Sequence, residues 1–198
     1  TDAGVHASGQ VAACVLNWQH SSADLRRALN ARLPEDVSIL EVSRAEAEFH
    51  PRYDASSRRY QYTIYHADVR HPLRDRYAWR IWPALEIDRL ERVTGLLLGR
   101  HDFAAFGRAM KKGGSTIREV FTSRWIADRD TLCYEIEANA FLYHMVRRLV
   151  YVQVKYVQGG IDDRDIEKGL NDGILMKPGL APAKGLSLVQ VKYSGARV

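Results

Sequence analysis

The clearest pattern of apolar and polar positions lies between residues 59 and 66. Tyr60, Tyr62 and Ile64 fall on one side of this segment, whereas Arg59, Gln61, Thr63 and Tyr65 fall on the other. A period of two is typical of a β-strand, because successive side chains point to opposite faces. The pattern therefore predicts a strand over 59–66 with an aromatic ladder on one face.

Further apolar segments predict the rest of a sheet. Segments 10–16, 37–42 and 186–193 are interpreted as strands, the first of them buried. Segments 118–127 and 131–138 have the spacing of a β-hairpin, with residues 128–130 as the turn.

Helices are predicted where apolar residues recur at every third or fourth position. One covers 25–33, with a cap in residues 21–24 and Pro34 as its stop. A second covers 87–97 and is ended by Gly99, and a long third runs from 141 to 158. A short capped helix begins at Asp162.

The order of these elements predicts the fold class. Strands and helices are interleaved, but the hairpin and the alternating faces favour an α+β fold, a mixed and largely antiparallel sheet with helices on one side. The 198 residues, 46% of them hydrophobic, suffice for a sizeable core. We interpret 1–198 as one region, with a lobe boundary expected near the polar 105–117 stretch.

The charge of the chain favours a polyanionic partner. The formal net charge is +5, and basic residues occur largely as doublets rather than as one tail. Distributed doublets suit a folded surface that follows a phosphate backbone, but they are equally typical of solvated helix and strand faces. The doublets are Arg26-Arg27, Arg58-Arg59, Lys111-Lys112 and Arg147-Arg148.

Two absences limit the function classes. No apolar run is long enough to span a membrane and no signal segment opens the chain, so we expect a soluble, cytoplasmic protein. Cys14 and Cys133 are far apart and lack metal-ligand spacing, which argues against a disulfide framework and a zinc site. Both are expected to be small core residues.

The first seven residues, Thr-Asp-Ala-Gly-Val-His-Ala, carry the candidate chemistry. They place Asp2 on a glycine-containing turn directly before an apolar run, which is how many active sites present a nucleophile or a base. From composition alone, a solvated N-terminus with no role for Asp2 is the more frequent case.

Motifs along the whole chain resemble those of the TruA family of tRNA pseudouridine synthases. The first is the Asp2 loop followed by Gly9-Gln10-Val11. The others follow in the family's order: Leu29-Asn30, Leu33-Pro34, Phe49-His50-Pro51-Arg52, Ser57-Arg58-Arg59-Tyr60-Gln61-Tyr62, Leu98-Gly99-Arg100-His101-Asp102-Phe103, Ala138-Asn139-Ala140-Phe141-Leu142-Tyr143-His144-Met145-Val146-Arg147 and Ala181-Pro182-Ala183-Lys184-Gly185-Leu186.

The resemblance implies a fold, a reaction and a substrate. The fold is the pseudouridine synthase fold with an active-site cleft, usually in a homodimer. The reaction isomerises uridine to pseudouridine in the anticodon stem-loop of tRNA, at tRNA positions 38–40. The isomerisation involves no net oxidation, so neither a cofactor nor a metal is expected.

The resemblance also implies the catalytic residues Asp2, Tyr60 and Arg147. Asp2 acts as a nucleophile or as a base, and the sequence leaves the two open. Tyr60 stacks on the flipped uracil and helps to remove the C5 proton, with Tyr62 as a packing residue. Arg147 pairs with Asp2 and lies on one helix face with His144 and Tyr151, whereas Arg148 is expected to be exposed. By pattern alone, Tyr60 is a core residue and Arg147 a surface residue.

The remaining candidates bind RNA or the uracil. His6, Arg52, Arg58 and Arg59 are expected to contact RNA, although His6 also suits an ordinary hydrogen-bonded histidine. Leu186 resembles an apolar wall beside the uracil, and an ordinary strand start is an equal alternative.

One departure from the family's pattern concerns the start of the chain. Members carry roughly fifty further residues before the Asp loop, including an Arg immediately before the Thr, a segment length that domain-size priors allow. This chain begins at Thr1 without Met, so it is interpreted as N-terminally truncated. The alternative function is a non-catalytic tRNA- or RNA-binding module.

Overall fold

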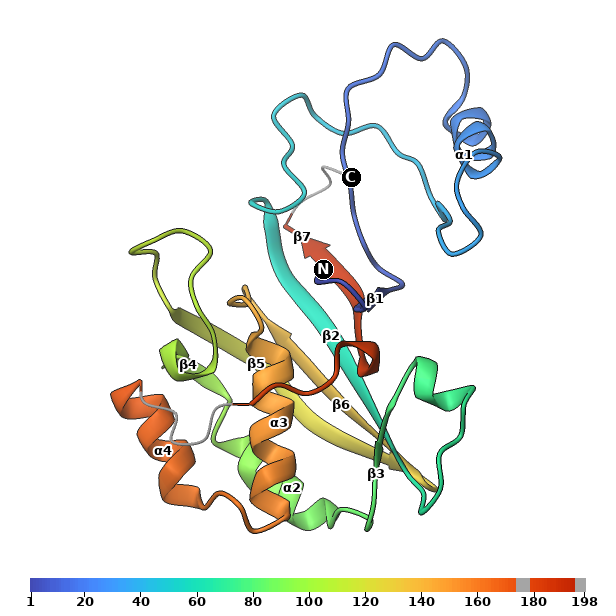
Figure 1. Cartoon of the computed structure of the whole chain (residues 1–198). Coiled ribbons are helices and arrows are strands. Elements are labelled where there is room, and N and C mark those ends of the chain that lie inside the picture. Colours follow the sequence, from blue (N-terminus) through green and yellow to red (C-terminus); the bar gives the residue numbers. More distant parts are fainter. Residues whose placement is uncertain (174–178, 195–198) are drawn as a thin grey trace. The chain divides into compact units, whose positions relative to one another are not determined.

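The structure, a computed structural model, describes residues 1–173 and 179–194. The chain forms two compact units (Figure 1). The first combines Thr1–Gln10 with Ser56–Lys192, and the second combines Val11–Ala55 with the residues from Tyr193 onward. The division falls elsewhere than the 105–117 stretch, where the lobe boundary stays a prediction.

One seven-stranded sheet organises the first unit, with the order β1-β7-β2-β6-β5-β4 and with β3 parallel to β2. The pairs β2/β6, β6/β5 and β5/β4 are antiparallel, whereas β1 runs parallel to β7. The predicted mixed, largely antiparallel sheet is confirmed. The strands are β1 (His6–Ala7), β2 (Ala55–His66), β3 (Trp79–Ile81), β4 (Gly99–Asp102), β5 (Ile117–Asp128), β6 (Thr131–Ala138) and β7 (Leu186–Tyr193).

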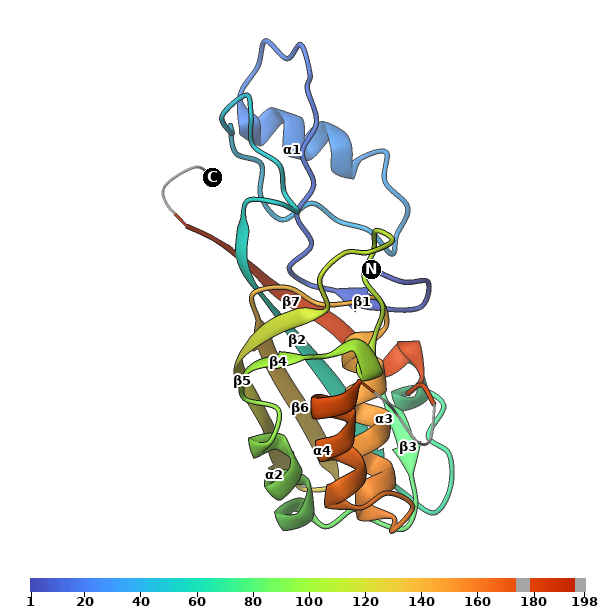
Figure 2. The ribbon, with the colours of Figure 1, turned by 90° about the vertical axis from the view of Figure 1, so that its left-hand side faces the viewer.

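Three helices cover one face of this sheet (Figures 1 and 2). They are α2 (Ile87–Gly95), α3 (Met145–Val157) and α4 (Asp163–Asp172), accompanied by the short turns η1 (Arg74–Arg76), η2 (Ala104–Phe106) and η3 (Ala183–Gly185). The fully buried Tyr62 and Ile64 of β2 share one hydrophobic core with Leu149 of α3. The aromatic ladder of the predicted strand therefore faces the helices, as its alternation requires.

The other face of β2 carries a charged network centred on β6. Glu137 pairs with Arg59 in the strand register and accepts hydrogen bonds from its Nε and Nη2, at 3.0 and 2.7 Å. Ser57 Oγ and Lys192 Nζ each donate to the other carboxylate oxygen at 2.7 Å. Burial alone would raise the pKa of Glu137, but the bonds from Lys192, Ser57 and Arg59 outweigh it and hold this pKa at about 2.

The second unit contains one regular element among its described residues, helix α1 (Ser22–Asn30). Ser21 and Asp24 form the predicted capping box, in which the Asp24 N–H donates to Ser21 Oγ and the Ser21 N–H to Asp24 Oδ2. The Asn30 side chain then exchanges two hydrogen bonds with the Ile39 backbone, at 2.7 and 2.9 Å. The chain after the helix is thus held by side-chain bonds.

Two predicted strands in this unit are wrong. Segments 10–16 and 37–42 belong to no strand, and Val15 and Leu40 are 100% and 70% exposed. A strand requires a neighbouring strand whose N–H and C=O groups form a ladder with its own, and neither segment belongs to the sheet. The backbone of Ile39 is bonded to the Asn30 side chain instead. The apolar composition of the two segments indicated burial, but a segment is buried only where another part of the chain packs against it.

The expectation of two core cysteines is wrong for Cys14. Its side chain is exposed in the irregular part of the second unit. Cys133 is half-buried on β6, where burial and the neighbouring charge of Glu135 raise the pKa of its thiol to about 11. Within 1–173 and 179–194, no helix is both long and apolar enough to cross a membrane.

Replacement of Glu137 by Gln will remove a pH-dependent part of the stability. The pKa of this carboxyl falls from 4.5 to about 2 on folding, so its contribution is complete above pH 4.5 and lost as the pH falls toward 2. Glu137→Gln should therefore cost on the order of 3 kcal/mol at pH 7. Urea unfolding should show this difference shrinking between pH 4.5 and 2.

The matched control is Glu119→Gln, the same change at an exposed position of β5. Its effect should be small at every pH. An equal effect of the two substitutions would contradict the stabilising role of the Glu137 network.

Candidate active site

The Asp2 loop is a tight turn anchored to the sheet. The Val5 N–H donates to the Asp2 carbonyl at 3.1 Å, and Gly4, the third residue of this turn, has φ +78°. A positive φ at this position favours glycine. Strand β1 follows directly and pairs with β7 in the register His6↔Ser187. Asp2 is therefore positioned by the fold.

Two side chains from the beginning of α3 converge on the Asp2 carboxylate. Arg147 Nη1 lies 3.6 Å and His144 Nε2 lies 3.2 Å from Asp2 Oδ2. Arg147 is itself fixed, because its Nε donates to the Ala181 carbonyl at 2.8 Å and its own carbonyl accepts from the Ala181 N–H at 3.2 Å. The predicted pairing of Arg147 with Asp2 is thus present in the structure.

His144 was not among the predicted site residues. The predicted helix from 141 begins instead at Met145, because His144 adopts a left-handed conformation with φ 65° at its N-cap. Its ring stacks on Tyr143, with centroids 3.7 Å apart. A signal existed in the sequence, since His144 and Arg147 are spaced i, i+3 within the family motif, but the turn that aims the ring at Asp2 is a tertiary feature.

The electrostatics of this site favour a neutral imidazole. Burial lowers the pKa of His144 below 6.5; Asp2 opposes this shift, whereas Arg147, Arg148 and Arg108 reinforce it. At neutral pH the ring is therefore uncharged, and Arg147 is the cationic partner of Asp2.

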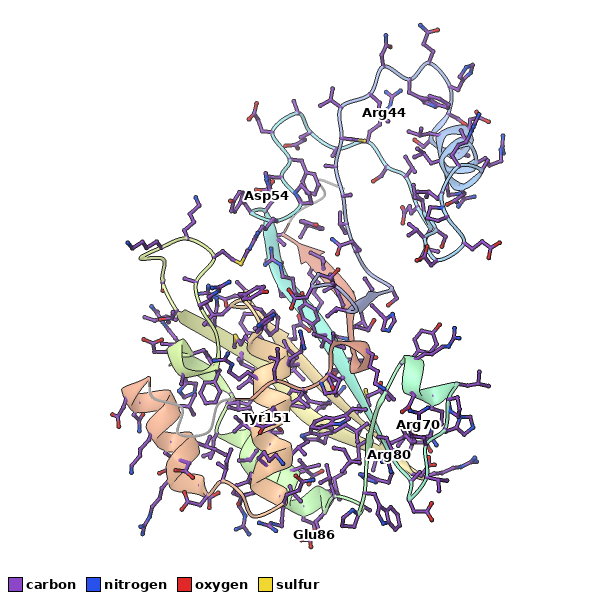
Figure 3. All side chains as sticks on the ribbon, in the orientation of Figure 1. Arg44, Asp54, Arg70, Arg80, Glu86 and Tyr151 are labelled. Carbon is purple, nitrogen blue, oxygen red and sulfur yellow. The ribbon has the colours of Figure 1, made fainter. Side chains whose placement is uncertain are left out.

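Two other residues of α3 have surroundings that the sequence did not predict. Arg148, expected to be exposed, is half-buried, and its Nε is buried without a hydrogen-bond partner among the described residues. Tyr151 (Figure 3) is partly buried against the core, and a Cβ on Gly179 would come within 2.1 Å of its ring. Tyr151 therefore packs under the chain that leads to β7, whereas His144 and Arg147 contact Asp2.

Tyr60 and Tyr62 occupy different environments, although both lie on the helix-facing side of β2. Tyr62 is fully buried and donates from its hydroxyl to the Pro182 carbonyl at 2.8 Å, so its predicted packing role is confirmed. Tyr60 is half-buried, and its ring meets Phe141 edge-on at 5.0 Å. Phe141 precedes His144 by three residues, so Tyr60 touches the segment that supplies the partner of Asp2.

The predicted apolar wall, Leu186, lies at the start of the strand next to β2. Strand β7, which begins at Leu186, lies between β1 and β2, and Leu186 is buried. Gly185 is required at this point, because a Cβ there would come within 2.6 Å of the Tyr62 ring. The role of Leu186 beside a uracil stays a prediction.

The predicted RNA-contacting residues are spread over the chain. His6 Nε2 lies 3.2 Å from the Arg76 carbonyl, and its ring is 4.9 Å from that of Tyr77. Arg58 donates to the Asn139 carbonyl at 3.0 Å. Each is thus engaged within the first unit, and its contact with RNA stays a prediction.

The other two predicted RNA-contacting residues, Arg59 and Arg52, have other partners. Arg59 points to the opposite face of the sheet, where Glu137 binds its guanidinium. Arg52 is exposed in a turn of the second unit, where its N–H donates to His50 Nδ1 at 3.1 Å. Their contacts with RNA also stay predictions. Among the described residues, no three His, Cys, Asp or Glu side chains are grouped to hold a metal ion.

Comparison with known proteins identifies the class to which this fold and site belong. A family model described as tRNA pseudouridine synthase matches residues 94–194, a range that contains His144, Arg147 and Leu186. The chain belongs to the tRNA pseudouridine synthases, in the TruA family indicated by its motifs.

Individual relatives resemble the chain over 98% of its length. The tRNA pseudouridine synthase A of Syntrophotalea carbinolica is 34% identical, and 77% of that protein is covered. The proteins of the same name from Roseiflexus castenholzii and a Thermoanaerobacter species are 38% and 36% identical, with 73% and 80% covered.

The left-handed conformation of His144 predicts an unusual order of variant stabilities. A side chain costs about 1–2 kcal/mol in this region, whereas glycine adopts it readily. His144→Gly should therefore be more stable than His144→Ala by about 1 kcal/mol in urea unfolding. At the exposed Glu167 in the middle of α4, the order should reverse by a similar amount. An alanine variant that equals the glycine variant at 144 would argue against the strained turn.

Proposed function

We propose that this protein isomerises uridine to pseudouridine in the anticodon stem-loop of tRNA, with Asp2 as the essential residue. The observation that carries the proposal is the placement of the Asp2 carboxylate between Arg147 and His144. The family to which the chain belongs supports the same reaction.

The reaction determines what the site must provide. The bond between C1′ and N1 breaks, the uracil turns, and C5 bonds to C1′. The proton lost from C5 is balanced by the one gained at N1, so no oxidant or reductant is required. The target must first leave its stack, which calls for a pocket that holds the flipped base.

Asp2 supplies the carboxylate that acts on the target nucleotide, as a nucleophile or as a base. Arg147 provides the positive charge that holds it, and the Ala181 carbonyl keeps the guanidinium from turning away. His144 Nε2 lies 3.2 Å from Oδ2, and in the neutral tautomer that carries its proton on Nε2 the ring donates to this oxygen and limits the rotation of the carboxylate. Both partners act on Asp2 by positioning.

Tyr60 is proposed to stack on the flipped uracil and to assist the loss of the C5 proton. Its half-buried ring meets Phe141, and both this ring and Leu186 belong to or pack against one hydrophobic core, which supports an apolar slot for the base. Contacts of His6, Arg52, Arg58 and Arg59 with RNA, a homodimer and a cytoplasmic location belong to the same proposal and rest on the family resemblance.

Replacement of Asp2 by Asn tests the proposal directly. The amide keeps the size of the side chain but removes its charge, so pseudouridine formation should fall at least about 10³-fold, whereas tRNA affinity should change less than about threefold. Pseudouridine is measured in transcribed tRNA without added metal or cofactor, and affinity by filter binding.

The control is Asp172→Asn, the same change at an exposed position at the end of α4. It should leave both quantities unaltered. Unchanged turnover of the Asp2 variant would refute the role of Asp2. Salt-sensitive tRNA binding without any product from the unaltered protein would instead indicate a non-catalytic RNA-binding module.

A further inference from the structure

A second feature of the first unit is a cavity that the mechanism above does not use. Its volume is about 550 Å³, and it lies between the 108–112 loop and Tyr143. Arg108, Ala109, Met110 and Lys112 line it from the loop side. All these residues belong to the first unit, so the cavity lies within one compact body.

The loop is tightly attached to the segment that carries His144. Arg108 and Tyr143 form an isolated antiparallel bridge, in which the Tyr143 N–H donates to the Arg108 carbonyl at 3.0 Å. Gly107 permits this approach, because a Cβ there would come within 2.6 Å of Leu142 Cβ and 3.0 Å of the Tyr143 carbonyl oxygen. The cavity wall is therefore held in place next to the active site.

A stack of three side chains connects the cavity to Asp2. The Arg108 guanidinium lies 4.7 Å from the centroid of the Tyr143 ring, and this ring stacks on His144, which contacts Asp2. With its ring engaged by both neighbours, Tyr143 is poorly placed to stack a nucleobase. What the cavity offers a ligand is mainly the positive charge of Arg108 and Lys112.

This charge is not neutralised by the protein. Within the described part of the chain, neither Arg108 nor Lys112 lies within ion-pair distance of a carboxylate, and both are exposed. Arg147 and Arg148 add further positive charge around His144, and Asp2 is the carboxylate paired there. An anion bound in the cavity would therefore meet an attractive potential from several arginines.

We propose that the Arg108–Lys112 cavity binds a backbone phosphate of the RNA strand immediately adjacent to the target uridine. This inference rests on the proposed function, because a uridine within a chain brings a phosphodiester on each side to the site. Two side chains, Tyr143 and His144, separate the cavity from Asp2, so the phosphate and the reacting uridine belong to neighbouring positions of one strand. The contact fixes the register of the strand without reading a base.

The first test compares charge removal in the cavity with an equal change elsewhere. The double variant Arg108→Gln/Lys112→Gln should weaken tRNA binding about tenfold at low salt. It should also reduce the slope of log K against log salt by about 0.7, the value for one single-strand phosphate. The control Arg164→Gln/Lys168→Gln removes two exposed charges from α4 and should leave the slope unchanged.

A charge-preserving variant separates binding from folding. Arg108→Lys/Lys112→Arg retains both charges and should keep the wild-type slope. If its slope of log K against log salt falls as much as that of the glutamine variant, the effect stems from the packing of Arg108 on Tyr143. That result would overturn the phosphate site.

A second test identifies which anion is bound. Neutral methylphosphonate linkages are placed singly on the 5′ and 3′ sides of the target uridine in the tRNA. At one of them, the wild-type protein should lose about as much affinity as the double variant does with unmodified tRNA. Combining that linkage with the double variant should cause little further loss. Additive losses at both linkages would overturn the proposal.

A different result would assign the cavity to a free anion instead. In that case inorganic phosphate would compete with tRNA for the wild-type protein but not for the double variant, and neither linkage would change the affinity. Pseudouridine formation is measured in parallel. Its absence from the wild-type protein would refute the proposed function, whereas the linkage and salt effects judge the phosphate site separately.

Discussion

The carboxylate of Glu137 is the constraint on which the sheet around the active site depends. It lies on β6, is almost fully buried, and accepts hydrogen bonds from Ser57 and Arg59 on β2 and from Lys192 on β7. A buried charge without these donors would cost several kcal/mol, so the three strands are held to one arrangement. Because β7 in turn pairs with β1, the same network supports the strand that follows the Asp2 loop.

The active site itself is assembled from distant parts of the chain by two unusual backbone conformations. Gly4 turns the loop that carries Asp2, and His144 turns the chain into α3 so that its ring meets this carboxylate. Glycine adopts a positive φ at little cost, whereas histidine does so against its intrinsic preference. The second turn persists because Tyr143 stacks on the ring and α3 is packed into the core.

Local patterns in the sequence correctly predicted the helices and strands that pack against other elements of the fold. The alternation around Tyr60 and Tyr62 predicted β2 and the face that meets the helices, and the residues around Asp24 and Asp162 predicted two capped helices. Similar apolar composition failed at Val15 and Leu40, because no described strand pairs with either segment. The pattern of apolar residues predicts which face of a segment is buried, but it does not predict which other part of the chain covers that face.

The sequence by itself determined the family and the pairing partners Asp2 and Arg147, because the motifs preserve the residue types that the chemistry needs. Only the tertiary structure decided that His144 contacts Asp2, that Arg59 forms an ion pair with Glu137, and that Arg108 lines a cavity near the site. The physical reason is range. Turn, cap and strand preferences act over a few residues, whereas the position of a charge relative to another depends on strand order, register and burial across the whole sheet.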